Sequence, residues 1–225
     1  MNFQNLFFVP FLISLFSTYF AVKWIIPRLE KKKIVGIDMN KEHRPSIPEM
    51  GGLSVIFGFI MGIYSQVILA NIFIDFNSLS FYLFASLVAI LGVSLIGIVD
   101  DLIGMSQRTK AILPFLFSLH LGAFTSSEMF VPFFGFIEFG YFMLLIVPIA
   151  ITSATNSANM LEGFNGLSCG LSIIISIALI IMSIINGVEE GLYLLFPLLG
   201  SLIAFAKFNF YPSKIFPGDS MTLFV

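Results

Sequence analysis

The chain has 225 residues, of which 58% are hydrophobic and only 11% are charged, and its formal net charge at pH 7 is −2. It contains 28 phenylalanines and far more apolar surface than the core of a soluble protein of this length needs. This composition excludes a soluble globular domain and predicts a polytopic membrane protein.

Mainly apolar windows of about 17 to 25 residues recur along the chain, and each is long enough to cross the roughly 30 Å hydrocarbon slab of a bilayer as a helix. They predict seven transmembrane helices, near residues 3–22, 51–70, 80–99, 111–126, 139–155, 165–186 and 191–208, and the start of an eighth at the C-terminus. The sequence contains no internal repeat, low-complexity tract or long linker. We therefore expect an all-α, polytopic transmembrane helical bundle, with residues 1–225 forming a single integral membrane domain.

Lysine and arginine are confined to alternate connections between these helices. They lie between the first and second spans, between the third and fourth, and after the seventh, at Lys23, Arg28, Lys31, Lys32, Lys33, Lys41, Arg44, Arg108, Lys110, Lys207 and Lys214. The opposite connections contain no basic residue and carry Asp75, Glu128, Glu138, Glu189 and Glu190. The positive-inside rule then places the basic loops in the cytoplasm and the N-terminus outside.

Four segments on the predicted cytoplasmic side are more polar than loop solubility requires. Their sequences are GIDMNKEHRPSIPEMGG, GIVDDLIGMSQRTK, NSANMLEGFNGLSCG and NFYPSKIFPGDSMTLF. In the second, Asp100 and Asp101 follow a strongly apolar run, and Lys110 comes nine residues after the pair. A solvated helix end would explain the acidic pair alone, but carboxylates and an ammonium group near one another suit metal-bound phosphate chemistry.

The third segment interrupts an apolar run with three asparagines and several glycines. Asn156 and Asn159 are three residues apart and share a helix face, and Gly163 and Gly166 allow the backbone to turn away and approach a ligand closely. An asparagine amide can ligate a hard cation through its oxygen or hydrogen-bond a nucleobase or phosphate. A polar helix-packing motif is the alternative, but the addition of Asn165 favours a binding site.

The fourth segment places one carboxylate, Asp219, after a glycine and at the start of a helix. A helix N-terminus attracts anions, and a carboxylate there can hold the metal ion to which an anion binds. Aspartate at this position is also an ordinary helix cap. This motif therefore indicates a metal-binding site only when it is considered together with the other three segments.

Taken in order, the motifs IPExGG, DD with a lysine nine residues on, NxxNMLEGFNGL and FYPSKIFPGDS resemble the polyprenyl-phosphate N-acetylhexosamine-1-phosphate transferase family, glycosyltransferase family 4. The resemblance covers residues 35–225 and is strongest to the archaeal and eukaryotic branch, the UDP-GlcNAc:dolichyl-phosphate GlcNAc-1-phosphotransferases. It implies active-site loops that face the cytoplasm. It also implies a multi-pass protein of the cell membrane, or of the endoplasmic reticulum membrane in a eukaryote.

The implied reaction transfers GlcNAc-1-phosphate from UDP-GlcNAc to a dolichyl or other polyprenyl phosphate, giving UMP and a lipid pyrophosphate sugar. Such a step begins the assembly of lipid-linked glycans for N-glycosylation or cell-surface polymers. The resemblance implies a Mg²⁺ cofactor, with Mn²⁺ as a substitute. The expected partners are the two substrates and the bilayer, with no nucleic acid, and a homodimer is compatible with this expectation.

Site residues follow from the resemblance position by position. It implies metal ligation by Asn159 and Asp219, and help in activating the attacking phosphate from Asp100 and Asp101. It implies substrate binding by Asp38, Met39, Glu49, Lys110, Asn156, Asn165, Gly166 and Phe216. Within this set Lys110 corresponds to the lysine that contacts the lipid phosphate, Asn165 to a uridine-binding asparagine, and Phe216 to an aromatic near the uracil.

The same motifs bear on three other functions. A phospho-MurNAc-pentapeptide-type or other hexosamine-1-phosphate transferase remains open. A CDP-alcohol phosphatidyltransferase would need a long acidic motif that Asp100-Asp101-Leu102 does not supply. A secondary transporter would place its polar groups at mid-membrane, whereas here they gather at helix ends. Because the family pattern usually continues with further helices and a basic loop, we expect this chain to be a truncated form without transfer activity of its own.

Overall fold

The computed structural model of the chain describes residues 3–39, 41–73 and 81–225. Its α-helices are α1 (Phe3–Lys32), α2 (Gly52–Phe73), α3 (Phe81–Ile103), α4 (Gln107–Phe124), α5 (Met143–Met160), α6 (Leu167–Ile185), α7 (Glu189–Asn209) and α8 (Asp219–Thr222). A short 3₁₀ helix, η2 (Gly140–Phe142), precedes α5. Two antiparallel strand pairs complete the described elements, β1 (Val35–Ile37) with β2 (Ser46–Pro48) and β3 (Glu128–Val131) with β4 (Gly135–Glu138).

Six of the described helices are long and apolar enough to cross a membrane, and they are α1, α2, α3, α5, α6 and α7, with η2 extending the fourth span. This confirms the all-α, multi-pass bundle. The predicted span at 111–126 is a helix, α4, but it starts at Gln107 and is not among the six, because its first turn contains Arg108 and Lys110. Asp75 lies outside the described residues.

The predicted end of the first span was wrong. Helix α1 continues ten residues beyond the predicted end at 22, so that Arg28 and Lys31 lie on the helix and not in a loop. The Arg28 guanidinium lies 3.7 Å from the centre of the Trp24 ring one turn earlier. Arginine and lysine are good helix formers, so the helix can continue through this charged stretch. At the C-terminal end, the helix predicted to start at Asp219 is present as the one-turn helix α8, and its being the start of an eighth span stays a prediction.

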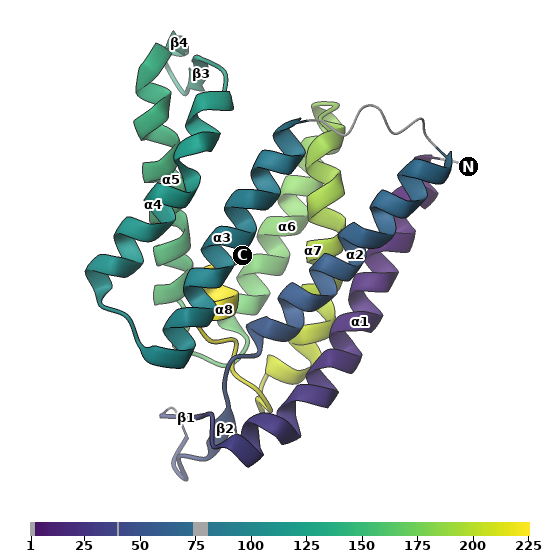
Figure 1. Cartoon of the computed structure of the whole chain (residues 1–225), viewed down its shortest axis with the longest axis vertical. Helices are drawn as coiled ribbons and strands as arrows, with labels where there is room; N and C mark the ends of the chain where they lie inside the picture. The colour runs from purple at the N-terminus through teal and green to yellow at the C-terminus, as the bar shows by residue number, and fades with distance from the viewer. Residues whose placement is uncertain (1–2, 40, 74–80) are drawn as a thin grey trace.

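The bundle core lies where α1, α2 and α7 pack together (Figure 1). Fully buried side chains fill it, among them Val22, Phe59 and Leu202. Small residues let the helix backbones approach closely, since a Cβ placed on Gly58 or Gly200 would overlap neighbouring atoms of α1. The helices therefore hold one another by close packing, as expected for helices surrounded by lipid.

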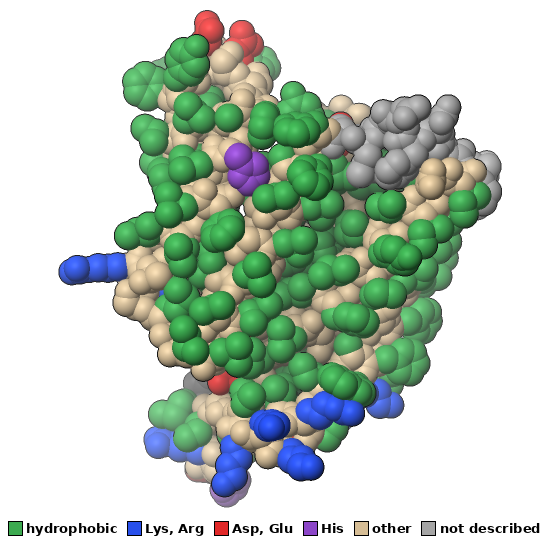
Figure 2. Space-filling view, viewed as in Figure 1, with side chains coloured by type: hydrophobic (Ala, Val, Ile, Leu, Met, Phe, Trp, Pro, Cys, Tyr) green, Lys and Arg blue, Asp and Glu red, His purple; other side chains and the backbone are tan. Residues whose placement is uncertain are grey.

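The connections β1–β2, α3–α4, α5–α6 and α7–α8 lie toward one end of the bundle, which we call the site end (Figure 1). Backbone hydrogen bonds tie the first of these connections to the last: the Phe216 N–H donates to Pro48 at 2.7 Å, and the Gly51 N–H donates to Phe216 at 2.9 Å. Most lysine and arginine side chains gather at this end, whereas acidic side chains cap the far end over β3 and β4 (Figure 2).

Helix α8 fits between α2 and α3 because both helices present a glycine to it. A Cβ on Gly97 of α3 would overlap the Asp219 carbonyl, and a Cβ on Gly52 of α2 would overlap the backbone of Ser220 and Met221. The Met221 side chain of α8 is fully buried in the core. This packing fixes the position of Asp219, the first residue of α8.

Candidate active site

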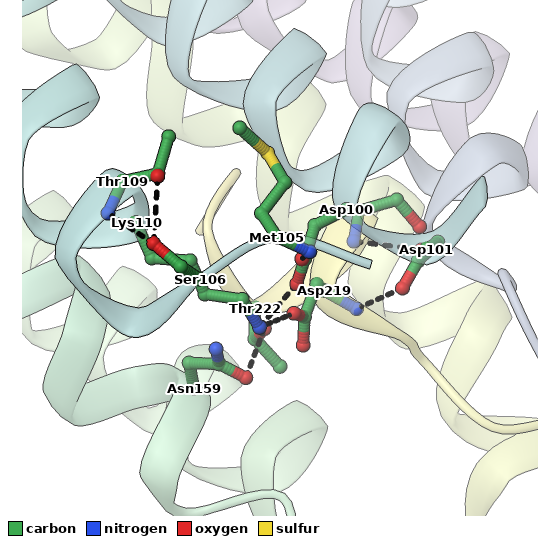
Figure 3. A network of polar contacts seen from close by, with 10 residues as sticks. Asp100, Asp101, Met105, Ser106, Thr109, Lys110, Asn159, Asp219 and Thr222 are labelled. Carbon is green, nitrogen blue, oxygen red and sulfur yellow. Dashed lines mark hydrogen bonds and ion pairs between the residues drawn. The ribbon is translucent and has the colours of Figure 1, made fainter. Parts of the chain in front are cut away.

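A polar network joins the ends of α3, α4 and α8 (Figure 3). The Lys110 amine of α4 makes ion pairs with the carboxylates of both Asp100 and Asp219. Asp100 also accepts a hydrogen bond from the Met105 N–H at 2.5 Å. Asp100 and Lys110 are both buried, so this charged group is largely shielded from solvent. The structure thus brings together three residues that sequence analysis assigned to the site.

The neighbouring carboxylate, Asp101, makes a different set of contacts. Its two oxygens accept hydrogen bonds from the Asp219 N–H at 2.7 Å and the Ser220 N–H at 2.9 Å. These N–H groups belong to the first turn of α8, where no intrahelical partner exists for them. Asp101 therefore caps α8 from α3 and holds the backbone of Asp219, while Asp100 faces Lys110.

The end of α5 and the turn after it also bind α8 and the glycine before it. Asn159 accepts a hydrogen bond through Oδ1 from the Thr222 hydroxyl at 3.2 Å, and Glu162 accepts one from the Gly218 N–H at 2.9 Å. Burial raises the pKa of Glu162 to about 8. Burial and the hydrogen bond with Asp100 raise the pKa of Asp219 to about 6, against the lowering effect of Lys110.

The side-chain oxygens of Asp219 and Asn159 are the candidate ligands for a divalent cation in this network. Among the described residues, no group of three or more His, Cys, Asp or Glu side chains could form a metal site made of protein alone. Asp219 supplies a carboxylate and Asn159 an amide oxygen, and Thr222 links them within one turn of α8. Mg²⁺ at phosphate-binding sites is commonly held by one or two protein oxygens together with substrate phosphates. The donor set fits that kind of site.

Next to this network lies a cavity of about 540 Å³. Its lining residues come from the first loop, the α5–α6 turn and the α7–α8 loop, namely Gly36, Ile37, Asp38, Met39, Glu49, Asn159, Glu162, Gly163, Phe164, Asn165, Asn209, Phe216 and Pro217. Six of the residues predicted for the site therefore meet here, although they lie far apart in the sequence. Burial, with the nearby Asp101 carboxylate as a second cause, raises the pKa of Glu49 in this wall.

Two predicted residues belong neither to the cavity lining nor to the polar network. The Asn156 amide donates to the Thr152 carbonyl at 2.9 Å, one turn earlier on α5, and so binds its own helix. Gly166 is the N-cap of α6 with φ 79°, and a Cβ there would overlap the Phe210 ring. A glycine is needed at this turn for its left-handed backbone and for this close approach. A substrate-binding role for either residue stays a prediction.

Sequence analysis missed Asn209, the last residue of α7, which is 1% exposed and lines the cavity. Its amide nitrogen donates to the Ile215 carbonyl at 3.0 Å. Its Oδ1 is buried, and no described residue donates a hydrogen bond to it. Buried polar atoms are rarely left without a partner, but this oxygen has almost no accessible surface, so the cavity does not reach it in this structure. The only sequence signal was one asparagine at the end of an apolar run.

The family is settled by comparison with known proteins. Residues 83–225 match the model of glycosyl transferase family 4. The chain belongs to this family. Among relatives of glycosyl transferase family 4, a protein of Saccharolobus solfataricus is 36% identical over 223 residues, covering 96% of this chain and 67% of its own length. It is provisionally named UDP-N-acetylglucosamine–dolichyl-phosphate N-acetylglucosaminephosphotransferase.

Two further relatives show the breadth of the family. A Sulfolobus acidocaldarius protein with the same provisional name is 32% identical over 224 residues, covering 96% of this chain and 66% of its own length. A phospho-N-acetylmuramoyl-pentapeptide-transferase of Aliarcobacter butzleri is 28% identical over 249 residues, covering 96% of this chain and 68% of its own length. The chain thus spans about two thirds of the length of the curated relatives it matches.

Proposed function

We propose that this chain forms the nucleotide-sugar site of an enzyme that transfers GlcNAc-1-phosphate from UDP-GlcNAc to dolichyl phosphate or another polyprenyl phosphate. The observation that carries the proposal is the joining of two features at the site end. One is the network of Lys110, Asp100 and Asp219, and the other is the adjacent cavity with its amide side chains and the Phe216 ring. The names of the archaeal relatives support this pair of substrates.

In the proposed reaction, a phosphate oxygen of the lipid attacks the β-phosphorus of UDP-GlcNAc, which carries the sugar. A new P–O bond forms as the bond from this phosphorus to the bridging oxygen breaks, and UMP leaves with that electron pair. The lipid phosphate is already ionised, so alignment and charge neutralisation matter more than a strong base. The Lys110 amine, held by Asp100, is placed to neutralise phosphate charge.

Asp219 and Asn159 would hold a Mg²⁺ ion, for which Mn²⁺ could substitute, and which when bound neutralises charge on the pyrophosphate. Asp101 keeps Asp219 in place through the α8 backbone. The cavity would take the uridine, with the Phe216 ring as an apolar wall and the amide of Asn165 as a hydrogen-bonding group. We also propose that the site end faces the cytoplasm and the N-terminus lies outside, because Lys and Arg gather at the site end (Figure 2).

The test has two stages because the chain spans about two thirds of its relatives. Binding of UDP-GlcNAc and UMP is measured on the purified chain in lipid nanodiscs. Turnover is measured on a chimera in which the chain replaces the matching part of the S. solfataricus relative, with dolichyl phosphate as acceptor and mass spectrometry of the lipid product. UMP release that stops on chelation of Mg²⁺ supports the proposal. Turnover of UDP-MurNAc-pentapeptide in place of UDP-GlcNAc would favour a phospho-MurNAc-pentapeptide-type transferase.

A further inference from the structure

The β3–β4 hairpin at the far end of the bundle is exposed over its whole length. No residue from Ala123 to Phe142 is buried, and in the described part of the chain β3 and β4 pair only with each other. A lone two-stranded hairpin is marginally stable in water and needs an apolar surface to pack on. Large apolar side chains of this stretch are available for such packing, namely Phe130, Phe133, Phe134, Phe136, Tyr141 and Phe142.

The turn of the hairpin places a phenylalanine where glycine or asparagine is usual. Phe133 has φ 71°, a left-handed backbone conformation that is strained for a bulky side chain. Its ring is fully exposed, so no contact with the described residues offsets this strain. A surface outside the chain that takes up the ring would offset it.

The place of the hairpin in the chain determines its depth relative to the bilayer. The membrane span that contains η2 and α5 begins at Gly140, directly after β4 ends at Glu138. The hydrocarbon core of a bilayer is about 30 Å thick and the headgroup layers bring the total to about 40–45 Å, so residues just before a span lie in or next to a headgroup layer. Aromatic side chains are favoured in this layer of a membrane.

The hairpin continues the lipid-facing surface of the two helices that carry it. Exposed apolar side chains occur along α4 and α5 up to the hairpin, among them Leu116, Phe124, Leu145 and Ile149. Because the chain is a multi-pass membrane protein, this surface faces the acyl chains of lipids. The apolar surface of the hairpin is thus continuous with an interface that is already occupied by the bilayer.

The charges of the hairpin indicate which part of it stays in water. Glu128 pairs with Glu138 at the open end of the hairpin, and Figure 2 shows acidic side chains at the outermost point of this end. Nearer the turn, Phe130 pairs with Phe136, with ring centres 5.4 Å apart. A second copy packed symmetrically on this hairpin would bring the carboxylates of two chains together, which like-charge repulsion disfavours. A bilayer surface takes up the rings and leaves the carboxylates hydrated.

We propose that the β3–β4 hairpin is an interfacial membrane-binding element. The phenylalanines near its turn insert into the boundary between headgroups and acyl chains of the leaflet at the far end, while Glu128 and Glu138 stay in water. The hairpin thereby holds the far ends of α4 and α5, whose opposite ends carry Lys110 and Asn159. The inference goes beyond the proposed function and does not depend on it, since it concerns the end of the bundle opposite the candidate site.

The test uses one tryptophan as a depth reporter in the purified 225-residue chain in lipid nanodiscs. The single native tryptophan is removed by Trp24→Phe, and Phe133→Trp is added to this background. Lipids brominated on their acyl chains should quench most of the emission of the new tryptophan, and aqueous iodide should quench little of it. His43→Trp in the same background is the control, because His43 is exposed in the β1–β2 connection. Iodide should quench this control and brominated lipids should not.

Each other outcome is decisive. Quenching of Phe133→Trp by iodide and not by brominated lipids would place the hairpin in water and overturn the inference. Protection from both quenchers would show that a second copy or another protein covers the ring, and would also overturn it. If the Trp24→Phe background does not fold, a nitroxide on Phe133→Cys decides, since the native Cys169 is buried. Relaxation of that nitroxide by dissolved oxygen supports the inference, whereas relaxation by an aqueous nickel chelate overturns it.

Discussion

The two carboxylates that end the apolar part of α3 are adjacent in sequence but serve different neighbours. Asp100 makes an ion pair with Lys110, whereas Asp101 binds the backbone of α8. Successive residues of a helix point about 100° apart, so one side chain can face a charged network while the next caps another helix. In the proposed reaction, Asp101 would therefore act through the position of Asp219 without touching the phosphates.

Replacement of Asp219 tests the proposed metal site at the scale of one residue. In the chimera, Asp219→Ala should lower the turnover number at least roughly 10²- to 10³-fold, the usual loss when a group that stabilises transition-state charge is removed. Glu138→Ala, an exposed carboxylate on β4 at the far end, is the matched control and should leave turnover unchanged. Most of the activity surviving in Asp219→Ala at ordinary Mg²⁺ concentration would remove Asp219 from the proposed metal site.

Glu162 should make stability depend on pH. Its pKa is raised from 4.5 to about 8 in the folded chain, mainly by burial, so the folded state binds this proton more tightly than the unfolded state. The stabilisation is complete below about pH 4.5 and is lost as pH rises through 8. The melting temperature of the wild-type chain should fall between pH 6 and 8.5, and Glu162→Gln should show a smaller fall. Parallel curves for the two proteins would contradict the assignment.

The sequence predicted many residues of the candidate site but not the contacts between them. The clustering of polar groups identified Asn159, Asn165 and Asp219 as candidates, and the family resemblance added Asp38. Their partners could not be foreseen, because Asp38 and Asn165 are 127 residues apart and are joined only by the fold. Asn209 escaped notice because one asparagine at a helix end is more often a packing or capping residue.

At the scale of elements, the short helix α8 depends on two glycines from neighbouring helices. Apolar windows predicted the long helices well, because a stretch that crosses lipid must be apolar over most of its length. They could not predict where α1 ends, since its last turns carry charges, nor that α4 starts before Lys110 and brings this residue into the network. Such boundaries are set by packing and by local contacts, which composition does not record.

Substitution of Gly97 tests the seating of α8. A Cβ at this position would overlap the Asp219 carbonyl, so Gly97→Ala should destabilise the chain by roughly 1–3 kcal/mol and displace Asp219. Gly170→Ala on α6 is the matched control, since a Cβ there would lie 3.7 Å from the Phe210 ring, an ordinary contact. The control should stabilise by roughly 0.5–1 kcal/mol through its higher helix propensity. Equal melting temperatures for the two variants would show that α8 moves freely.

At the scale of the whole molecule, the basic side chains are concentrated at one end of the bundle. They lie mostly at the site end, together with the buried carboxylates of the candidate site, whereas the charged side chains seen over β3 and β4 at the far end are acidic (Figure 2). The site end also contains the four connections that build the candidate site (Figure 1). One orientation in the membrane therefore determines both which side the loops occupy and which side the nucleotide must come from.

Single cysteines can test that orientation against a clean background, because the one native cysteine, Cys169, is fully buried in the core. Cysteines placed at Lys32 and Arg108, both exposed, should react with a membrane-impermeant maleimide only from the cytoplasmic side. A cysteine at the exposed Glu190, on the opposite connection, should react only from outside. The basic residues near the site end should hold it in the cytoplasm, since translocating them is unfavourable. Labelling of the Lys32 and Arg108 cysteines from outside would reverse the orientation and place the candidate site out of reach of a cytoplasmic nucleotide sugar.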